Sequence, residues 1–319
     1  MPASKWTTRK AADGEEELPA VSVLIAEAAS AIVELTLLSQ ITGDMRYFDV
    51  ISRVTDVLDQ QQGSTKLPIP VMGSISVDTR TPNLAFDTFF GLGAMADSAF
   101  EYLPKMHQLL NSAGPAAQYR KLREYAMDTA KAHTLFRPMV HDQADILIAS
   151  AKHDGPDGRR DDTGQHLMRR KISDGCAWTY KNAPSEIMPE VFSMTLCPSR
   201  SACDFIPGSP PFSTVHDGQY ILRPEAIEPI MYSFRLTGEA KYQDIAWDMF
   251  QAIEASTRTE FGNAALRIVM DTRSEQDESM ESFWLAEMLK YFYLIFCDHD
   301  VISLDDFVFN TEAHPFRIP

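Results

Sequence analysis

The sequence predicts an all-α fold built from repeated αα-hairpins, an arrangement that forms solenoids or closed toroids. Two observations lead to this prediction. Apolar residues recur at helical spacing along most of the 319-residue chain. In addition, "LSQITGDMRYFDV" (38–50) and "SFRLTGEAKYQDI" (233–245) share one pattern: a helix end, Thr-Gly-acid, one residue, basic-Tyr and a new amphipathic helix. Such a repeated turn indicates a chain of αα-hairpins.

The predicted helices have ordinary stop signals and are separated by loops. Gly43 ends the first helix, because glycine adopts the left-handed conformation of a helix terminus without strain. The segments with helical periodicity are 23–43, 90–110, 119–136, 242–257 and 280–296. Residues 61–86, 150–168 and 197–219 are rich in Gly, Pro, Ser and Asp, and we expect them to form loops.

Composition and charge narrow the class of protein. Hydrophobic residues make up 45% and charged residues 23%, which is typical of a soluble globular domain. The net charge of −16 argues against nucleic acid as a partner, because phosphate binding needs an excess of Lys and Arg. Residues 1–20 are polar and lack the apolar core of a signal peptide, and the apolar run at 291–296 is too short to cross a bilayer. Taken alone, these features indicate a cytosolic protein.

The four cysteines complicate that assignment. Cys197 and Cys203 flank "PSRSA" in a predicted loop, where a short-range disulfide and a reduced pair are both feasible. Cys176 and Cys297 lie in apolar segments, where buried thiols are common. The cysteine count alone does not settle the compartment.

Two glutamates in "RPEAIEP", Glu225 and Glu228, form a candidate functional site. Pro224 suits a first helical turn, so Glu225 falls where the helix dipole favours an anion, with Glu228 on the same face. A solvated pair that complements the dipole is the ordinary alternative. However, Glu27 lies sixteen residues before the glycine of the first turn, and Glu225 thirteen before that of the second. In a closed toroid, acids at corresponding helix ends line one mouth.

Other acids share this placement, several of them beside aromatic residues. Those of interest are Asp97, Glu190, Glu281 and Glu287, with Phe283 and Trp284 between the last two. Each one alone is unremarkable. Together they indicate a sugar site, because glycosidases use carboxylates for acid–base chemistry and aromatic rings stack on sugar faces.

The C-terminal stretch "FVFNTEAHPFRIP" (307–319) raises a question of metal binding. Thr311 followed by Glu312 could be a simple helix cap, and a lone histidine such as His314 is a poor metal candidate. Oxygen atoms are nevertheless the ligands that a hard cation prefers. The tail is therefore kept as a candidate cation site.

Six stretches of the chain carry a resemblance to a known family: "AEAASAIVELTLLSQITGD" (26–44), "GAMADSAFEYLPKM" (93–106), "DGCAWTYKNAPSEIMPEVF" (174–192), "YILRPEAIEPIMYSFRLTGEAKYQDIAWDMF" (220–250), "ESFWLAEMLKYFYLIF" (281–296) and "FVFNTEAHPF" (307–316). Together they closely resemble the fungal members of glycoside hydrolase family 47, the class I α-1,2-mannosidases. The resemblance divides the chain into a polar N-terminus outside the family, 1–20, and a partial catalytic domain, 21–319.

The resemblance implies an (α/α)7 barrel, here incomplete, and a calcium-dependent enzyme. The implied reaction is the inverting hydrolysis of terminal α-1,2-linked mannose from high-mannose N-glycans on glycoproteins, in which one carboxyl group protonates the leaving oxygen and another activates water. It further implies a monomer that works in the secretory pathway, in the endoplasmic reticulum or the Golgi.

Position by position, the resemblance assigns roles to nine residues. The implied catalytic residues are Asp97, Glu190 and Glu225; the substrate-binding residues are Glu27, Arg223, Glu228, Phe283 and Glu287; and the calcium ligand is Thr311, through its hydroxyl and carbonyl oxygens. Glu225 is the implied water-activating base, and Asp97 is the other candidate for direct proton transfer. We expect the acids to line one cavity with Thr311 at its floor.

Two departures from the family pattern affect the expected activity. The family's "VFE"-type motif, which carries a leading general-acid candidate, is absent from residues 1–20. "QHL" (165–167) also runs straight into "MRRKISDGC", which removes the usual disulfide partner of Cys176. We therefore expect little or no hydrolysis from this chain alone. The alternatives are an inactive relative that binds mannose glycans or glycoproteins, and an αα-repeat scaffold without a sugar site.

Overall fold

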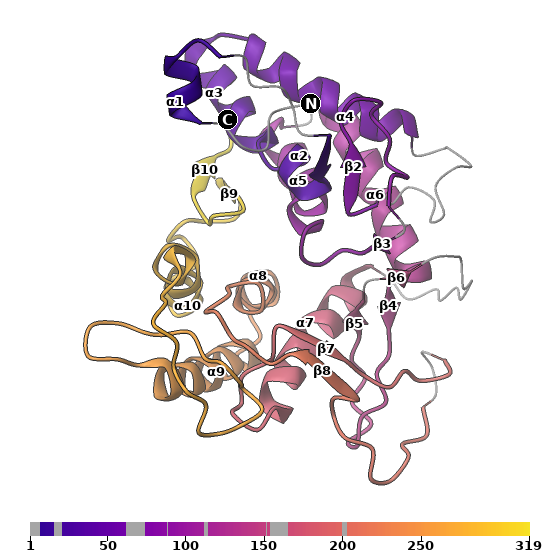
Figure 1. Cartoon of the computed structure of the whole chain (residues 1–319), viewed down its shortest axis with the longest axis vertical. Coiled ribbons are helices and arrows are strands. Elements are labelled where there is room, and N and C mark those ends of the chain that lie inside the picture. The colour runs from indigo at the N-terminus through magenta and orange to yellow at the C-terminus, as the bar shows by residue number, and fades with distance from the viewer. Residues whose placement is uncertain are drawn as a thin grey trace. The chain divides into compact units, whose positions relative to one another are not determined.

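The structure, a computed structural model, describes residues 7–15, 21–61, 74–87, 89–111, 114–150, 152–153, 165–199 and 203–319. The chain divides into two compact units. Unit 1 comprises Met1–Leu135, Ala149–Asp161 and Asp305–Pro319, and unit 2 comprises Phe136–Ile148 and Asp162–Leu304. Both units are mostly helical, with short two-stranded sheets between the helices (Figure 1).

Unit 1 is built from two helical hairpins and short antiparallel strand pairs. Its elements are α1 (Thr8–Ala12), β1 (Ser22–Leu24), α2 (Ile25–Ala29), α3 (Ile32–Thr42), α4 (Arg46–Gln61), β2 (Ser76–Asp78), β3 (Phe89–Phe90), α5 (Asp97–Leu109), α6 (Ala116–His133), β6 (Lys152–His153), β9 (Phe307–Phe309) and β10 (Pro315–Arg317). α3 packs against α4, and α5 against α6. β1 pairs with β2, β3 with β6, and β9 with β10.

The core of unit 1 holds α5 in place from several sides. Buried residues of α2, α3, α5 and α6 form one hydrophobic cluster, which includes the fully buried Tyr102 and the nearly buried Tyr119. The Tyr119 hydroxyl lies 3.1 Å from the Thr55 hydroxyl, so this polar group is satisfied inside the core. β9 packs against α5, which brings the C-terminal strand pair to this core.

Unit 2 contains the helical hairpin of the second Thr-Gly-acid turn and the helices around it. Its elements are α7 (Gln165–Asn182), β7 (Val191–Ser193), β8 (Thr214–Asp217), α8 (Ile227–Thr237), α9 (Lys241–Thr257), a π-helix η1 (Trp284–Met288) and α10 (Leu289–Ile295). α8 packs against α9, α7 and α10, and β7 pairs with β8 in antiparallel fashion. The chain passes between the units within β4 (Leu135–Phe136) and β5 (Ile148–Ala149).

The two predicted hairpin turns are confirmed and share the same geometry. Gly43 and Gly238 adopt left-handed conformations with φ of 73° and 68°. Thr42 and Thr237 each donate a hydrogen bond of 2.7 Å to the carbonyl four residues earlier. Each threonine oxygen also accepts the N–H two residues later, at 3.2 Å. The Thr-Gly-acid sequence therefore encodes one local helix stop in both places.

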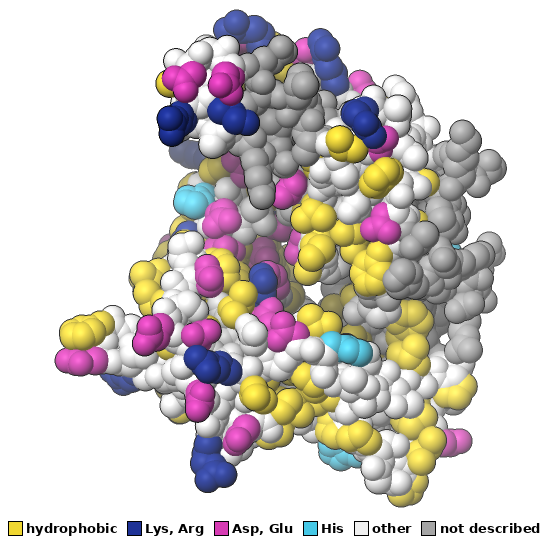
Figure 2. Space-filling model, viewed as in Figure 1, with side chains coloured by type: hydrophobic (Ala, Val, Ile, Leu, Met, Phe, Trp, Pro, Cys, Tyr) yellow, Lys and Arg dark blue, Asp and Glu magenta, His cyan; other side chains and the backbone are white. Residues whose placement is uncertain are grey.

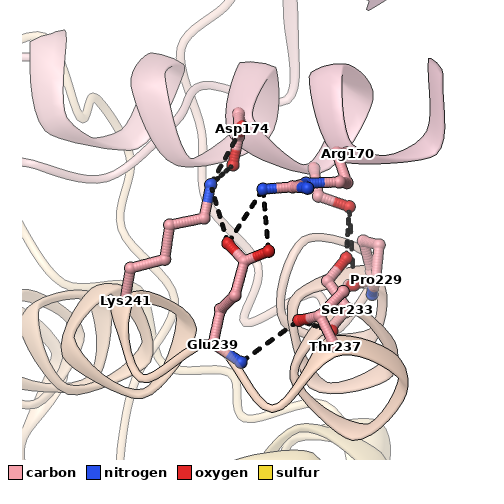
Figure 3. Close-up of polar contacts among 8 residues, drawn as sticks. Arg170, Asp174, Pro229, Ser233, Thr237, Glu239 and Lys241 are labelled. Carbon is pink, nitrogen blue, oxygen red and sulfur yellow. Dashed lines mark hydrogen bonds and ion pairs between the residues drawn. The ribbon is translucent and has the colours of Figure 1, made fainter. Parts of the chain in front are cut away.

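The surroundings of the two turns differ. Figure 3 shows that Glu239 and Lys241 in the second turn bind α7, through Arg170 at 2.8 Å and Asp174 at 3.0 Å. Tyr242, the next residue of this turn, is fully buried.

In the first turn, by contrast, the corresponding ion pair is local. Arg46 lies 2.5 Å from Asp44 in the same turn, and Tyr47, the counterpart of Tyr242, is 36% exposed. The same turn sequence is thus packed against a helix in one unit and exposed in the other.

Three predicted helices were too long at their N-terminal ends. The segment 23–43 begins with strand β1 and breaks after Ala29 into two helices. The segment 90–110 is helical only from Asp97, because Gly91 and Gly93 and the positive φ of Met95 (75°) interrupt it. The segment 280–296 becomes helical only at Ser282, and a π-helix follows at Trp284–Met288.

Short strands and two helices, α1 and α7, were not predicted. β2 and β8 lie inside the predicted loops 61–86 and 197–219, and α7 starts at Gln165, inside the predicted loop 150–168. The strands are two to four residues long, which is too short for a period-2 pattern to stand out. Most of 150–164 lies outside the described residues.

The disulfide that the sequence left open is formed. Cys197 is bonded to Cys203, whereas Cys176 and Cys297 are free thiols. Burial raises the pKa of the Cys176 thiol to about 11, so this group stays protonated at neutral pH.

One segment passes a length-and-composition test for a membrane span. Residues 25–42 have a mean hydropathy of 1.3, and 39% of this window is buried in the structure. Core helices of soluble proteins and signal sequences pass the same test. Here the window covers α2 and α3, and Ile25, Ile32 and Val33 within it belong to the core of unit 1.

The described surface carries charges of both signs. Figure 2 shows Lys and Arg side chains interspersed with Asp and Glu on the face in view, together with scattered apolar side chains. This agrees with a chain that has 29 basic and 45 acidic residues.

Candidate active site

Arg223 is the centre of a charged cluster in unit 2. Its Nε donates to Oε2 of Glu190 at 2.6 Å, and its Nη1 lies 3.5 Å from Oε1 of Glu225. The Glu190 side chain is only 14% exposed, whereas that of Glu225 is 52% exposed. One guanidinium therefore lies between a largely buried carboxylate and one that is open to solvent.

The backbone around this cluster is held in an unusual conformation. Leu222 is fully buried with a positive φ of 66°, which a non-glycine residue adopts only when its surroundings enforce it. Oε1 of Glu190 accepts the N–H of Ile221 at 3.2 Å, and the Glu190 N–H binds the carbonyl of Gln219 at 3.1 Å. These contacts fix the chain that leads to Arg223.

Glu225 lies just before α8, and Glu228 is in its first turn. The regular helix begins at Ile227, but the carbonyl of Pro224 already accepts the N–H groups of Ile227 (3.0 Å) and Glu228 (3.1 Å). The predicted helical turn at Pro224 is thus present, although regular helix starts three residues later. Glu225 lies at the positive end of the helix dipole, as expected.

Phe283, just before η1, joins this cluster, and the acidic Glu287 lies within η1. The Arg223 guanidinium carbon lies 5.9 Å from the centroid of the Phe283 ring, which is within cation–π distance. Glu287, on η1, is 94% buried, and π-helices occur often at functional sites. Burial lowers the pKa of Lys290, and the charge of Glu287 opposes that shift.

Two buried tyrosines near the cluster were missed by the sequence analysis. The rings of Tyr180 and Tyr220 meet edge to face, with centroids 6.5 Å apart. Burial raises the pKa of both hydroxyls well above the ordinary value, and the charges of Glu190 and Glu225 raise it further. Tyr180 belongs to α7, and no local pattern indicated that it would meet residue 220.

The charge of Arg223 is secured by its neighbours. Burial lowers its pKa, but the charges of Glu190 and Glu225 raise it by more, so the net shift is upward. Arg223 is therefore a permanent cation between the two carboxylates.

Unit 1 contains two more of the predicted acids. Glu27 is exposed on α2, and Asp97 is the first residue of α5, where its Oδ1 accepts the N–H of Ser98 at 3.0 Å. The N–H of Ala26 binds the carbonyl of Met95 at 3.1 Å, and α2 packs against α5. Both acids therefore belong to the first turns of two helices that pack against each other.

Thr311 lies in the turn between β9 and β10. The Oδ1 of Asn310 accepts the N–H groups of Glu312 (3.1 Å) and His314 (2.7 Å), and Ala313 has a positive φ of 56°. The N–H of Thr311 donates to the Tyr102 hydroxyl at 2.9 Å. Within the described part of the chain, neither the hydroxyl nor the carbonyl oxygen of Thr311 has a hydrogen-bond partner.

The oxygen atoms of Thr311 are of the type that a calcium ion prefers. Calcium takes about six to eight oxygen ligands, and Thr311 offers two oxygens that no described group occupies. Oε2 of Glu34, which is linked to Thr311 through Tyr102, is buried without a hydrogen-bond partner in the described structure. A nearby cation would compensate such a buried negative oxygen. Among the described residues no group of three or more His, Cys, Asp or Glu forms a metal cluster, so most ligands would not be protein carboxylates.

The structure thus brings some predicted residues together and places others in separate units. Arg223 contacts Glu190, Glu225 and Phe283 within unit 2, which also contains Glu228 and Glu287. Glu27, Asp97 and Thr311 belong to unit 1. The single cavity expected for all of them, and the role of each, stay predictions.

Comparison with solved structures shows that the fold is similar to that of a known enzyme. The chain superposes on an alpha-1,2-mannosidase from Trichoderma reesei with a TM-score of 0.79 and 28% sequence identity. The similarity covers 95% of this chain and 68% of that structure.

Curated proteins of similar sequence bear related names. A mannosyl-oligosaccharide 1,2-alpha-mannosidase of Arabidopsis thaliana is 32% identical over 315 residues, which covers 92% of this chain and 52% of that protein. An endoplasmic reticulum mannosyl-oligosaccharide 1,2-alpha-mannosidase of Homo sapiens is 29% identical, over 92% of this chain and 44% of that protein. The chain therefore spans about half the length of these relatives.

The sequence profile of one family covers nearly the whole chain. The profile of Glycosyl hydrolase family 47 matches residues 1–169 and 168–318. The first match begins within the segment that the sequence analysis sets apart, and a domain boundary at residue 20 stays a prediction. With this coverage, and with the structural similarity above, the chain belongs to Glycosyl hydrolase family 47.

Proposed function

We propose that this chain takes part in the calcium-dependent hydrolysis of terminal α-1,2-linked mannose on N-glycans. The observation that carries the proposal is the cluster in which Arg223 lies between Glu190 and Glu225 and over Phe283. Carboxylates, a fixed cation and an aromatic ring are the groups that a glycosidase uses to bind and cleave a sugar. The proposed specificity for α-1,2-linked mannose rests on the names of the relatives, which are α-1,2-mannosidases.

The proposed roles follow from exposure and charge. A base that activates water must be ionised and within reach of solvent. Glu225 is 52% exposed and lies 3.5 Å from the Arg223 guanidinium. We assign Glu225 as the water-activating base, and Asp97 and Glu190 as the other catalytic carboxyl groups. In an inverting enzyme, acid and base are roughly 6.5–9.5 Å apart, which leaves space for the attacking water.

The remaining residues are proposed to bind the sugar. Arg223 donates to sugar hydroxyls and carries positive charge; Phe283 provides an apolar face; and the carboxylates of Glu27, Glu228 and Glu287 accept hydroxyl hydrogen bonds. Thr311 would hold the calcium ion through its hydroxyl and carbonyl oxygens. When bound, calcium supplies a positive charge that orients and polarises oxygen ligands.

The architecture and the setting are proposed on the same basis. Two hairpins with equal turns, and the similarity to the Trichoderma enzyme, support an (α/α)7 barrel that is incomplete in this chain. High-mannose N-glycans on glycoproteins are the proposed partners, and the secretory pathway is the proposed compartment. The latter rests on the human relative, whose name places it in the endoplasmic reticulum. We propose a monomer.

The test is the release of free mannose from α-1,2-mannobiose, measured with calcium present and with a chelator. Release that depends on calcium and is lost in Glu225→Gln supports the proposal, and it would overturn the expectation that this chain alone hydrolyses little or none of the substrate. Glu275→Gln is the matched control, because Glu275 is an acid of the same unit that is 80% exposed and paired with Arg267. Calcium-dependent binding without release would instead indicate an inactive relative that binds mannose glycans. Absence of both would overturn the proposal and leave an αα scaffold.

A further inference from the structure

The peptide group that precedes Thr311 is anchored to a buried tyrosine. The N–H of Thr311 donates to the hydroxyl of Tyr102 at 2.9 Å, and the Tyr102 side chain on α5 is completely buried. The same hydroxyl donates to Oε1 of Glu34, on α3, at 2.8 Å. Tyr102 therefore connects the Thr311 turn to a carboxylate inside unit 1.

The peptide group that follows Thr311 is anchored through Asn310. Oδ1 of Asn310 accepts the N–H of Glu312 at 3.1 Å, and this N–H belongs to the same planar unit as the carbonyl of Thr311. In a trans peptide the carbonyl points away from the N–H, so this hydrogen bond directs the Thr311 oxygen away from Asn310.

Both anchors end on the same carboxylate oxygen. Nδ2 of Asn310, which is 94% buried, donates to Oε1 of Glu34 at 2.8 Å, the atom that also accepts from Tyr102. Hydrogen bonds to a charged acceptor are roughly twice as strong as those between neutral groups. Burial also makes each member costly to leave without a partner. Glu34 is thus the common support of both peptide groups around Thr311.

We propose that Glu34 is a positioning residue for the calcium site and acts through Tyr102 and Asn310 to hold the Thr311 carbonyl and hydroxyl ready for the ion. This inference rests on the proposed calcium site at Thr311. The N–H groups on both sides of the carbonyl are engaged, while the two candidate ligand oxygens have no partner in the described part of the chain. Groups that orient metal ligands in this way typically change metal affinity by about 10–100-fold when they are replaced.

The test is the calcium dissociation constant of the full chain, measured by isothermal titration calorimetry in calcium-depleted buffer. Tyr102→Phe removes only the hydroxyl, and Glu34→Gln is nearly isosteric but removes the charge. We expect each variant to weaken calcium binding by about tenfold or more. The calcium-induced rise in melting temperature should shrink in parallel.

Tyr119→Phe is the matched control for a purely structural effect. Tyr119 is also a buried tyrosine of unit 1, and its hydroxyl contacts that of Thr55 instead of the Thr311 turn. This variant should lower the calcium-free melting temperature but keep the wild-type calcium affinity. Circular dichroism verifies that each variant is folded. If Tyr102→Phe does not fold, the calcium affinity of Glu34→Gln alone tests the positioning role.

The outcomes separate this inference from the calcium assignment itself. If the wild-type chain binds no calcium, or Thr311→Ala binds it as well as wild type, the assignment of Thr311 is wrong. If Thr311→Ala loses binding while Tyr102→Phe and Glu34→Gln keep wild-type affinity, only the positioning role is wrong. If these two variants have a lower melting temperature but an unchanged calcium affinity, Glu34 has only a structural role.

Discussion

Nε of Arg223 lies 2.6 Å from Oε2 of Glu190, and the Glu190 side chain is 86% buried. A carboxylate in such a place is costly to leave without its cation. The pair therefore fixes the chain on which Glu225 is presented.

Replacement of Arg223 by Met should remove the cation of the candidate site and the ion pair with Glu190 that fixes the chain before Glu225. We expect a loss of about 10²-fold or more in kcat/KM, because the Glu190 carboxylate stays buried without its cation. If the chain binds mannobiose without turnover, the same loss should appear in its affinity for mannobiose. The measurement is steady-state kinetics or calorimetry with α-1,2-mannobiose. Arg267→Met is the control, since Arg267 is 58% exposed and pairs with surface acids. Equal effects of both variants would contradict the role of Arg223.

The two hairpin turns allow a paired test of stability. Lys241→Met breaks an ion pair with Asp174 on α7, whereas Arg46→Met breaks a pair confined to its own turn. Lys241 is 42% exposed, so after allowance for solvent screening we expect a loss of only about 0.5–1 kcal/mol, with almost none for Arg46→Met. Urea denaturation measures both. A loss for Arg46→Met as large as that for Lys241→Met would show that the contact with α7 adds nothing.

The pair between Trp178 and Asp142 predicts a dependence on acid pH. The indole N–H of Trp178 donates to Oδ2 of Asp142 at 3.0 Å. Burial raises the pKa of Asp142, but this hydrogen bond and others lower it by more, and the net shift is below the ordinary 3.8. A carboxyl group whose pKa is depressed in the folded state stabilises the fold above its ordinary pKa, and this stabilisation is lost as the pH falls through the folded-state value.

Asp142→Asn should therefore be less stable than wild type at pH 6, by about 1 kcal/mol or less because Asp142 is exposed. The difference should shrink below about pH 4. Urea titrations at several pH values measure it. A difference that is the same at pH 3 and pH 6 would mean that the charge of Asp142 contributes nothing.

Local signals explain what could be predicted from the sequence. The helix stops at Gly43 and Gly238 follow from a Thr-Gly-acid turn whose hydrogen bonds lie within four residues. The acids of the candidate site were found by resemblance and not by periodicity, because an exposed glutamate at a helix start is usually a dipole partner.

Contacts that join distant segments could not be predicted. β1 pairs with β2 across more than 50 residues, and strands this short have no pattern of their own. Glu34 is 276 residues from Asn310, and nothing near either residue indicates the other. The break after Ala29 is also tertiary in origin, because residues 22–24 pair as strand β1 and both α2 and α3 pack on the core.

The central claim is that calcium and α-1,2-linked mannose bind this chain together. The most direct measurement is the affinity for α-1,2-mannobiose, with calcium and with a chelator, for the wild-type chain and for Thr311→Ala, with α-1,3-mannobiose as the linkage control. Because linkage is reciprocal, an ion that assists the sugar must itself bind more tightly in its presence. We expect calcium to raise the affinity at least about tenfold in the wild type and not in Thr311→Ala. Equal affinity with and without calcium would contradict the account.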